Sequence, residues 1–154
     1  MLNLIAQKLD RLGVTANMAT LTGFLTSFVA AYFLSQGLWL EGMFWILLAG
    51  AFDLIDGRLA RLRKAPDAHL NRFGALFDSA LDRYSDALFY LSVAYFYLKL
   101  DRDFYGILAL SACAGAFEIS YIRARIEGLG GQCRVGFWER AERIAALVIG
   151  CLKR

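Results

Sequence analysis

Long apolar runs alternate with short polar segments along most of the chain, and these runs have membrane length. Ahead of them, Leu2, Ile5, Leu9 and Leu12 recur at helical spacing among polar residues, which predicts an interfacial helix over residues 1–13. The longer runs predict membrane spans at about residues 18–34, 43–60, 73–98, 104–121 and, in part, 140–152. The last apolar run is shorter than the roughly 20 residues that cross a bilayer. We therefore expect four full spans and a shortened fifth.

Composition supports a helical membrane protein. Hydrophobic residues make up 58% of the chain, compared with roughly 45–50% in soluble globular domains. There is a single proline, and no repeat or low-complexity stretch separates one region from another. The sequence thus predicts one all-α domain over residues 1–154, a polytopic transmembrane helical bundle with an N-terminal interfacial helix.

The positive charges predict how the chain is threaded through the membrane. Most Lys and Arg residues fall at the amino terminus, in the segment 58–72 and in the segment 123–143, which lie on one side of an alternating threading. Only Lys99 and Arg102 fall in loops on the other side. Because cytoplasmic loops collect Lys and Arg, the first set should be cytoplasmic. We expect an integral protein of the cytoplasmic membrane with any polar site near that face.

Four aspartates stand in or beside apolar runs, where an ionised carboxylate costs free energy unless it is neutralised. Asp53 and Asp56 are spaced i, i+3, and Asp78 and Asp82 are spaced i, i+4, so each pair shares one helical face. Carboxylates are hard ligands suited to Mg²⁺, Mn²⁺ or Ca²⁺, and sites that handle phosphates often hold one or two such ions on acidic side chains. The alternative is an ion-pair network with nearby arginines: Arg58, Arg61, Arg72 or Arg83.

Other residues around the acids are expected to support them. Gly57, Ala60 and Gly74 are small enough for close approach of a helix or a flat ligand. Arg61 can donate two parallel hydrogen bonds to a phosphate, or its side chain can extend to the lipid headgroups. Asp86 is expected to be a half-exposed supporting residue.

The order of these residues resembles the signature of the CDP-alcohol phosphotransferase (CDP-alcohol phosphatidyltransferase) family of membrane enzymes. The matching string is Asp53-x2-Asp56-Gly57-x2-Ala60-Arg61, followed by Gly74-x3-Asp78-x3-Asp82. Thr15-Ala-Asn17-x2-Thr20 resembles the family's entry to the first span, with Ala16 in place of proline. The chain departs from the pattern in two ways. Twelve residues separate Arg61 from Gly74, against about eight in the family, and the family has six spans.

The resemblance implies a reaction and a role for each matching residue. Family members transfer a substituted phosphoryl group from CDP-diacylglycerol or another CDP-alcohol to an alcohol and release CMP. By resemblance, Asp53, Asp56, Asp78 and Asp82 bind Mg²⁺ or Mn²⁺, and Asp82 also serves as the general base. The residues expected to contact the donor nucleotide and its diphosphate are Gly57, Ala60, Arg61 and Gly74. The resemblance further implies a lipid bilayer around the protein and a homodimer, and no nucleic-acid partner is expected.

A second region suggests the acceptor. Ser120-Tyr-Ile-Arg123-Ala-Arg125 and Glu139-Arg140-Ala-Glu-Arg143 are similar to the branch that makes phosphatidylinositol phosphate. This similarity implies that Arg123, Arg140 and Arg143 bind an acceptor phosphate; ordinary cytoplasmic positive charge is the alternative. Related branches that make phosphatidylglycerol phosphate or inositol-phosphate solutes share much of the pattern. From a different class, a cation transport protein would use the aspartates as an ion site.

Overall fold

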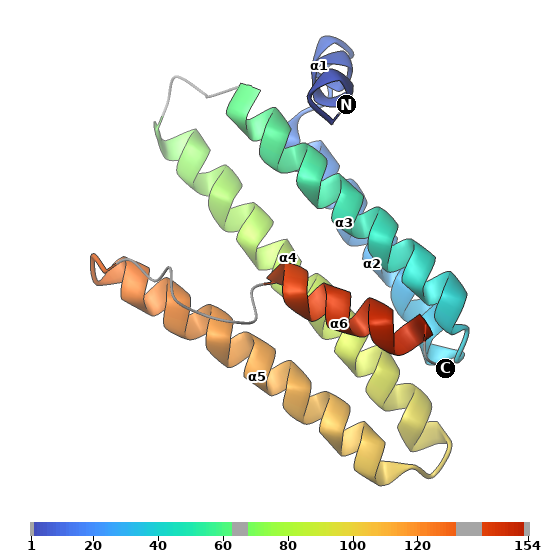
Figure 1. The fold of residues 1–154 in the computed structure, drawn as a ribbon. Coiled ribbons are helices and arrows are strands. Elements are labelled where there is room, and N and C mark those ends of the chain that lie inside the picture. Colours follow the sequence, from blue (N-terminus) through green and yellow to red (C-terminus); the bar gives the residue numbers. More distant parts are fainter. Residues whose placement is uncertain (1, 63–67, 132–139, 153–154) are drawn as a thin grey trace.

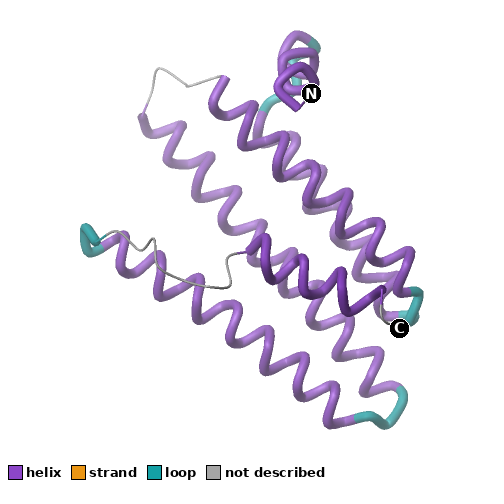
Figure 2. Tube along the Cα trace, in the orientation of Figure 1, coloured by secondary structure: helices purple, strands orange, loops and turns teal. Residues whose placement is uncertain are grey.

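The computed structural model describes residues 2–62, 68–131 and 140–152, and all regular structure in these ranges is α-helical (Figures 1 and 2). The helices are α1 (Leu2–Arg11), α2 (Ala16–Ser35), α3 (Trp39–Leu62), α4 (Ala68–Lys99), α5 (Asp103–Gly128) and α6 (Arg140–Leu152). The prediction of an all-α architecture is therefore confirmed for the described part of the chain.

The long helices extend beyond the apolar runs that predicted them. α4 begins at Ala68 rather than near residue 73, and α5 continues to Gly128 rather than 121. Polar turns keep helical geometry but carry no apolar signal, so the hydrophobic pattern does not detect them. As a result, Leu62 and residues 68–73 of the segment between Arg61 and Gly74 are helical, while residues 63–67, Pro66 among them, lie outside the described residues.

Two of the described helices, α2 and α5, are long and apolar enough to cross a membrane by length and composition alone. α3 has 24 residues and α4 has 32. At 1.5 Å per residue they extend about 36 Å and 48 Å, more than the roughly 30 Å hydrocarbon core of a bilayer. Both helices carry charged residues over several turns. Where each span begins and ends stays a prediction.

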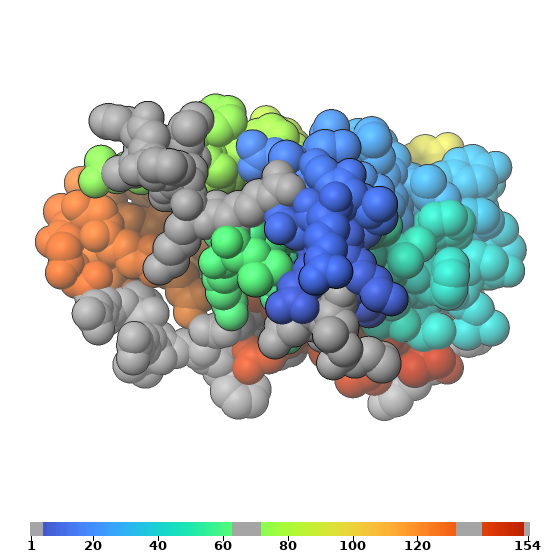
Figure 3. Space-filling view, turned by 90° about the horizontal axis from the view of Figure 1, so that it is seen from above, coloured from blue at the N-terminus to red at the C-terminus, as the bar shows by residue number. Residues whose placement is uncertain are grey.

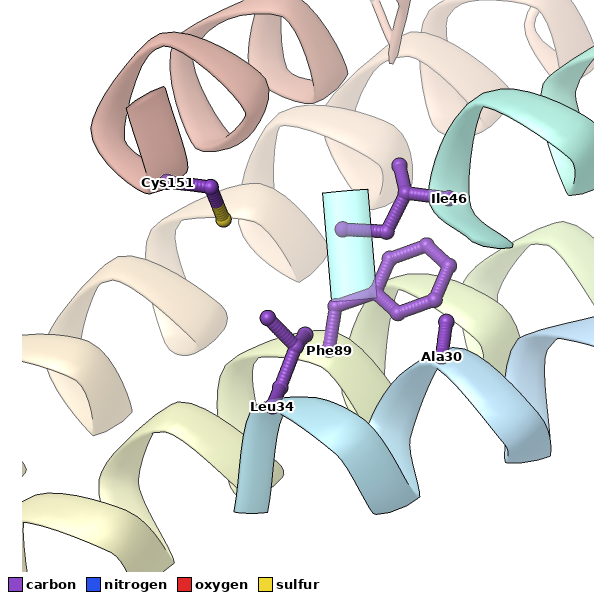
Figure 4. Close-up of a cluster of buried hydrophobic side chains, with 5 residues drawn as sticks. All are labelled: Ala30, Leu34, Ile46, Phe89 and Cys151. Atoms are coloured by element: carbon purple, nitrogen blue, oxygen red, sulfur yellow. The ribbon is translucent and has the colours of Figure 1, made fainter. Parts of the chain in front are cut away.

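The core lies where α3 and α4 both pack against α2 (Figure 1). Figure 4 shows Phe89 of α4 directed toward Ile46 of α3, with Ala30 and Leu34 of α2 beside it. Cys151 brings α6 to the edge of this cluster. These side chains are almost fully buried, so the packing sets the register of α4 against the other two helices.

Glycines allow the chain to turn and the helices to approach each other closely. Gly37 adopts φ +74° in the turn between α2 and α3, a conformation that residues with a Cβ rarely adopt. A Cβ on Gly23 would lie 3.1 Å from Phe52 Cβ, so α2 and α3 depend on this small residue for their contact. This close contact places the C-terminal half of α3, which carries Asp53 and Asp56, against α2.

α1 lies across one end of the bundle (Figure 3). Its buried Ala6 packs against Ala19 of α2 and Leu59 of α3. The C-terminal ends of α3 and α5 and the N-terminal end of α4 lie toward this same end of the molecule (Figure 1). The ends predicted to be cytoplasmic therefore gather together.

Candidate active site

Three of the predicted acids converge between α3 and α4. Asp53, Asp78 and Asp82 each offer a carboxylate oxygen, and these oxygens lie within 4.8 Å of one another. The two helices run antiparallel to each other and both pack against α2, so Asp53 in the second half of α3 comes close to Asp78 and Asp82 in the first half of α4. At this separation, three like charges repel one another and favour a cation between them.

Asp56 completes the acidic side of the site. It is buried, and its Oδ2 atom has no hydrogen-bond partner among the described residues. Asp78 Oδ1 is buried and lacks a partner in the same way. Buried carboxylate oxygens without partners are costly, and a hard divalent cation accepts such ligands. The donor set of the cluster therefore fits Mg²⁺ or Mn²⁺.

Arg140 of α6 contacts two of these acids in the structure. Its Nη1 atom lies 2.7 Å from Asp53 Oδ1 and 2.7 Å from Asp82 Oδ1. The sequence suggested ion pairs with arginines closer in the chain, such as Arg83, whereas this arginine comes from a helix far along the chain. Arg83 instead donates to the backbone oxygen and the hydroxyl of Ser79.

The acids face a polar cavity of about 450 Å³. Its lining comes from the end of α3, the early turns of α4, the end of α5 and the start of α6. The lining residues that were predicted from sequence are Asp53, Asp56, Gly57, Arg61, Asp78, Asp82, Arg123 and Arg140. A Cβ on Gly57 would meet no atom within 4 Å, so this position opens into free space. The cavity thus combines oxygen ligands, room beside a helix and several guanidinium groups.

Three predicted residues lie outside this cavity lining. Ala60 is exposed on α3. Gly74 faces α2, where an added Cβ would make ordinary contact with Asn17 Oδ1 at 3.6 Å. Arg143 is buried and donates from Nη2 to Asp86 Oδ2 at 2.9 Å. It lines a separate, mostly apolar cavity of about 590 Å³ between α4, α5 and α6.

Two residues near the site differ from what the sequence predicted. Arg58, considered there only as an ion-pair partner, lines the cavity. Asp86 is 6% exposed, so the expectation that it is half-exposed is wrong. It lies one turn beyond Asp82 on the same face of α4, and this i, i+4 spacing was the available signal. Its burial results from α6, whose position no local pattern determines.

Comparisons with known proteins agree with this geometry. The family model for CDP-alcohol phosphatidyltransferase matches residues 13–153. An archaetidylinositol phosphate synthase of Methanothermobacter thermautotrophicus is 38% identical over 93% of this chain and 69% of its own length. The corresponding synthase of Pyrococcus horikoshii is 37% identical over 96% of this chain and 74% of its own length.

Solved structures are similar as well. The phosphatidylinositol phosphate synthase of Mycobacterium tuberculosis with CDP-DAG bound superposes with a TM-score of 0.87 at 29% identity, covering 98% of this chain and 75% of that one. The same enzyme in complex with manganese and citrate gives a TM-score of 0.86 at 30% identity, covering 98% and 71%.

These matches confirm four expectations from the sequence: the family resemblance, the helical membrane fold, the transferase class and the use of a divalent metal. The family match covers both halves of the acid motif and the arginine-bearing helix α6. The chain belongs to the CDP-alcohol phosphatidyltransferase family of metal-dependent membrane enzymes.

Proposed function

We propose that this chain transfers the phosphatidyl-type group of a CDP-linked lipid, such as CDP-diacylglycerol, to inositol phosphate and releases CMP. One observation carries the proposal: a single cavity holds both the acid cluster and two arginines from other helices, Arg123 and Arg140. A metal-dependent donor site and a binding site for an anionic acceptor are therefore adjacent. The relatives named archaetidylinositol phosphate synthase and phosphatidylinositol phosphate synthase support the choice of acceptor.

The acids form the donor side of the proposed site. Asp53, Asp56, Asp78 and Asp82 would hold Mg²⁺ or Mn²⁺, which supplies charge stabilisation for a diphosphate when bound. Gly57 leaves space beside α3 for the nucleotide. Arg61 lines the same cavity and can donate two hydrogen bonds to a phosphate. Donor contacts by Ala60 and Gly74 stay predictions, because both lie outside the cavity lining.

The acceptor side of the proposed site combines arginines for the acceptor phosphate with a carboxylate that accepts the hydroxyl proton. Arg123 and Arg140 place positive charge where the phosphate of the acceptor would bind. The acceptor hydroxyl oxygen forms the new bond to the lipid-bearing phosphorus, and the bond from that phosphorus to the CMP oxygen breaks. A carboxylate oxygen of Asp82 accepts the hydroxyl proton, as in general base catalysis. Acceptor binding by Arg143 stays a prediction, since its guanidinium pairs with Asp86.

We further propose that the site faces the cytoplasm from the cytoplasmic membrane. The distribution of Lys and Arg supports this orientation. The amphipathic helix α1, which lies across the end of the bundle where α3 ends and α4 begins, is suited to a membrane surface there. The expected homodimer stays a prediction.

The test supplies labelled CDP-diacylglycerol, or its archaeal ether-lipid counterpart, with inositol phosphate, glycerol phosphate or free inositol in the presence of Mg²⁺. We expect lipid product and CMP with inositol phosphate and far less with the other acceptors. Product with glycerol phosphate alone would overturn the choice of acceptor. A cation transport protein would instead move ions across vesicles without any cytidine nucleotide, and metal-dependent binding of a CDP compound excludes that alternative.

A further inference from the structure

Asp86 connects two arginines of α6 to α4. Its Oδ2 atom accepts from Arg143 Nη2 at 2.9 Å, and its Oδ1 atom lies 3.5 Å from Arg140 Nε. Both Asp86 and Arg143 are at most 8% exposed, so this pair is shielded from solvent. Removing one partner of a buried pair is costly because it leaves an uncompensated charge.

The guanidinium of Arg140 contacts two sets of carboxylates through different nitrogen atoms. The Nε edge faces Asp86, whereas Nη1 lies 2.7 Å from Asp53 Oδ1 and 2.7 Å from Asp82 Oδ1. Asp53 and Asp82 belong to the group of three acids that fits a divalent cation, and Asp86 does not. Asp86 is also absent from the lining of the polar cavity. It can therefore affect the site only through the arginines or as a more distant charge.

A guanidinium and a divalent cation compete for the same carboxylates. Both are positive, and Arg140 Nη1 already lies 2.7 Å from Asp53 Oδ1 and Asp82 Oδ1, so a divalent cation bound to these acids and the guanidinium repel each other. Binding of a metal therefore favours movement of Arg140 toward another acid. Asp86, already in contact with Nε, is the acid that can retain it.

We propose that Asp86, on α4, is a positioning residue that holds the guanidinium of Arg140 from α6. In this way it keeps the guanidinium from displacing divalent metal at Asp53 and Asp82. The proposal rests on the proposed function, since it assigns a metal to this acid cluster. Together with Arg143, Asp86 would hold Arg140 beside the acids, where it can contact an acceptor phosphate.

The test measures Mn²⁺ affinity of the purified protein in detergent, by electron paramagnetic resonance of free Mn²⁺ and by calorimetry, without substrates. Arg140→Gln removes the competing cation and should tighten Mn²⁺ binding by about tenfold, equivalent to about 1.4 kcal/mol. Asp86→Asn removes the alternative partner of Arg140 and should weaken binding by about tenfold. The exposed Asp103→Asn, in the first turn of α5, is the matched control and should bind Mn²⁺ like the parent.

The double variant distinguishes positioning from simple loss of a nearby negative charge. If Asp86 acts through Arg140, the double variant Asp86→Asn/Arg140→Gln should bind Mn²⁺ within about threefold of Arg140→Gln alone. An equal weakening by Asp86→Asn in both backgrounds would overturn the proposal.

The single variant Arg140→Gln keeps the proposal testable even where Asp86→Asn fails to fold. Unchanged or weaker Mn²⁺ binding by Arg140→Gln would show that the guanidinium does not compete with the metal for these carboxylates. Failure of the parent protein to bind Mn²⁺ at all would instead refute the proposed metal site itself. The two failures are therefore distinguishable.

Discussion

Replacement of Asp78 by Asn should stabilise the fold in the presence of a chelator and abolish stabilisation by divalent metal. The oxygens of Asp53, Asp78 and Asp82 lie within 4.8 Å of one another. At an effective dielectric constant of about 20, two unit charges at that distance repel by about 3.5 kcal/mol. Neutralising Asp78 removes two of the three pairwise repulsions, about 7 kcal/mol before screening.

The net gain is much smaller than this sum. The site opens to a cavity of about 450 Å³, so solvent screens the charges. Arg140 also compensates Asp53 and Asp82 directly, at 2.7 Å each. Asp78 has no such contact at its buried Oδ1 atom. We expect a net gain of about 1–2 kcal/mol, or about 3–6 °C in Tm for a chain of this size.

The assay is thermal unfolding in detergent with a chelator and with Mn²⁺. The parent protein should gain stability as Mn²⁺ is added, because a ligand that binds only the folded state shifts unfolding. Asp78→Asn should begin at a higher Tm in chelator and show almost no Mn²⁺ response. The exposed Asp101→Asn, at the opposite end of α4, is the control and should behave like the parent. A lower Tm in chelator together with a full Mn²⁺ response would refute the assignment of Asp78 to a metal site.

Three further predictions address other parts of the molecule. Asp82→Asn should reduce the rate of CMP release by at least about 100-fold, the lower range for loss of a general base. A rate equal to that of the parent protein in a single-turnover assay would rule out Asp82 as the base. Arg123→Gln should raise the KM for inositol phosphate about tenfold, near 1.4 kcal/mol, and leave the donor KM unchanged. Arg102→Gln, exposed in the loop before α5, should change neither constant. Phe89→Ala should destabilise the fold by about 3–5 kcal/mol through the cavity that it leaves, measured as a lower Tm, whereas the exposed Tyr95→Ala should cost far less.

Local patterns were enough to predict that these acids form a metal site. The i, i+3 and i, i+4 spacings place Asp53 with Asp56 and Asp78 with Asp82 on single faces, because helical geometry determines facing within a helix. The order of the motif then identified the family, and the family match supports that inference. The composition identified a helical membrane protein, since apolar runs of this length are typical of helices that cross a bilayer.

The same patterns were less informative about small residues. Gly57 and Gly74 were both predicted to contact the donor, yet Gly57 opens into the cavity and Gly74 faces Asn17 of α2. Which face of a helix meets a cavity depends on how neighbouring helices pack against it. Residues such as Phe89 and Ile46, far apart in the chain, determine that packing.

The sequence by itself determined the class of protein, the family and the acids that would hold a metal, because these depend on composition and on spacing within one helix. Only the tertiary structure decided which cation contacts those acids. Arg140 reaches Asp53 and Asp82, and Arg143 reaches Asp86, since α6 packs beside α3 and crosses over α4. Such contacts join residues more than fifty positions apart, and their geometry follows from long-range packing rather than from any local period.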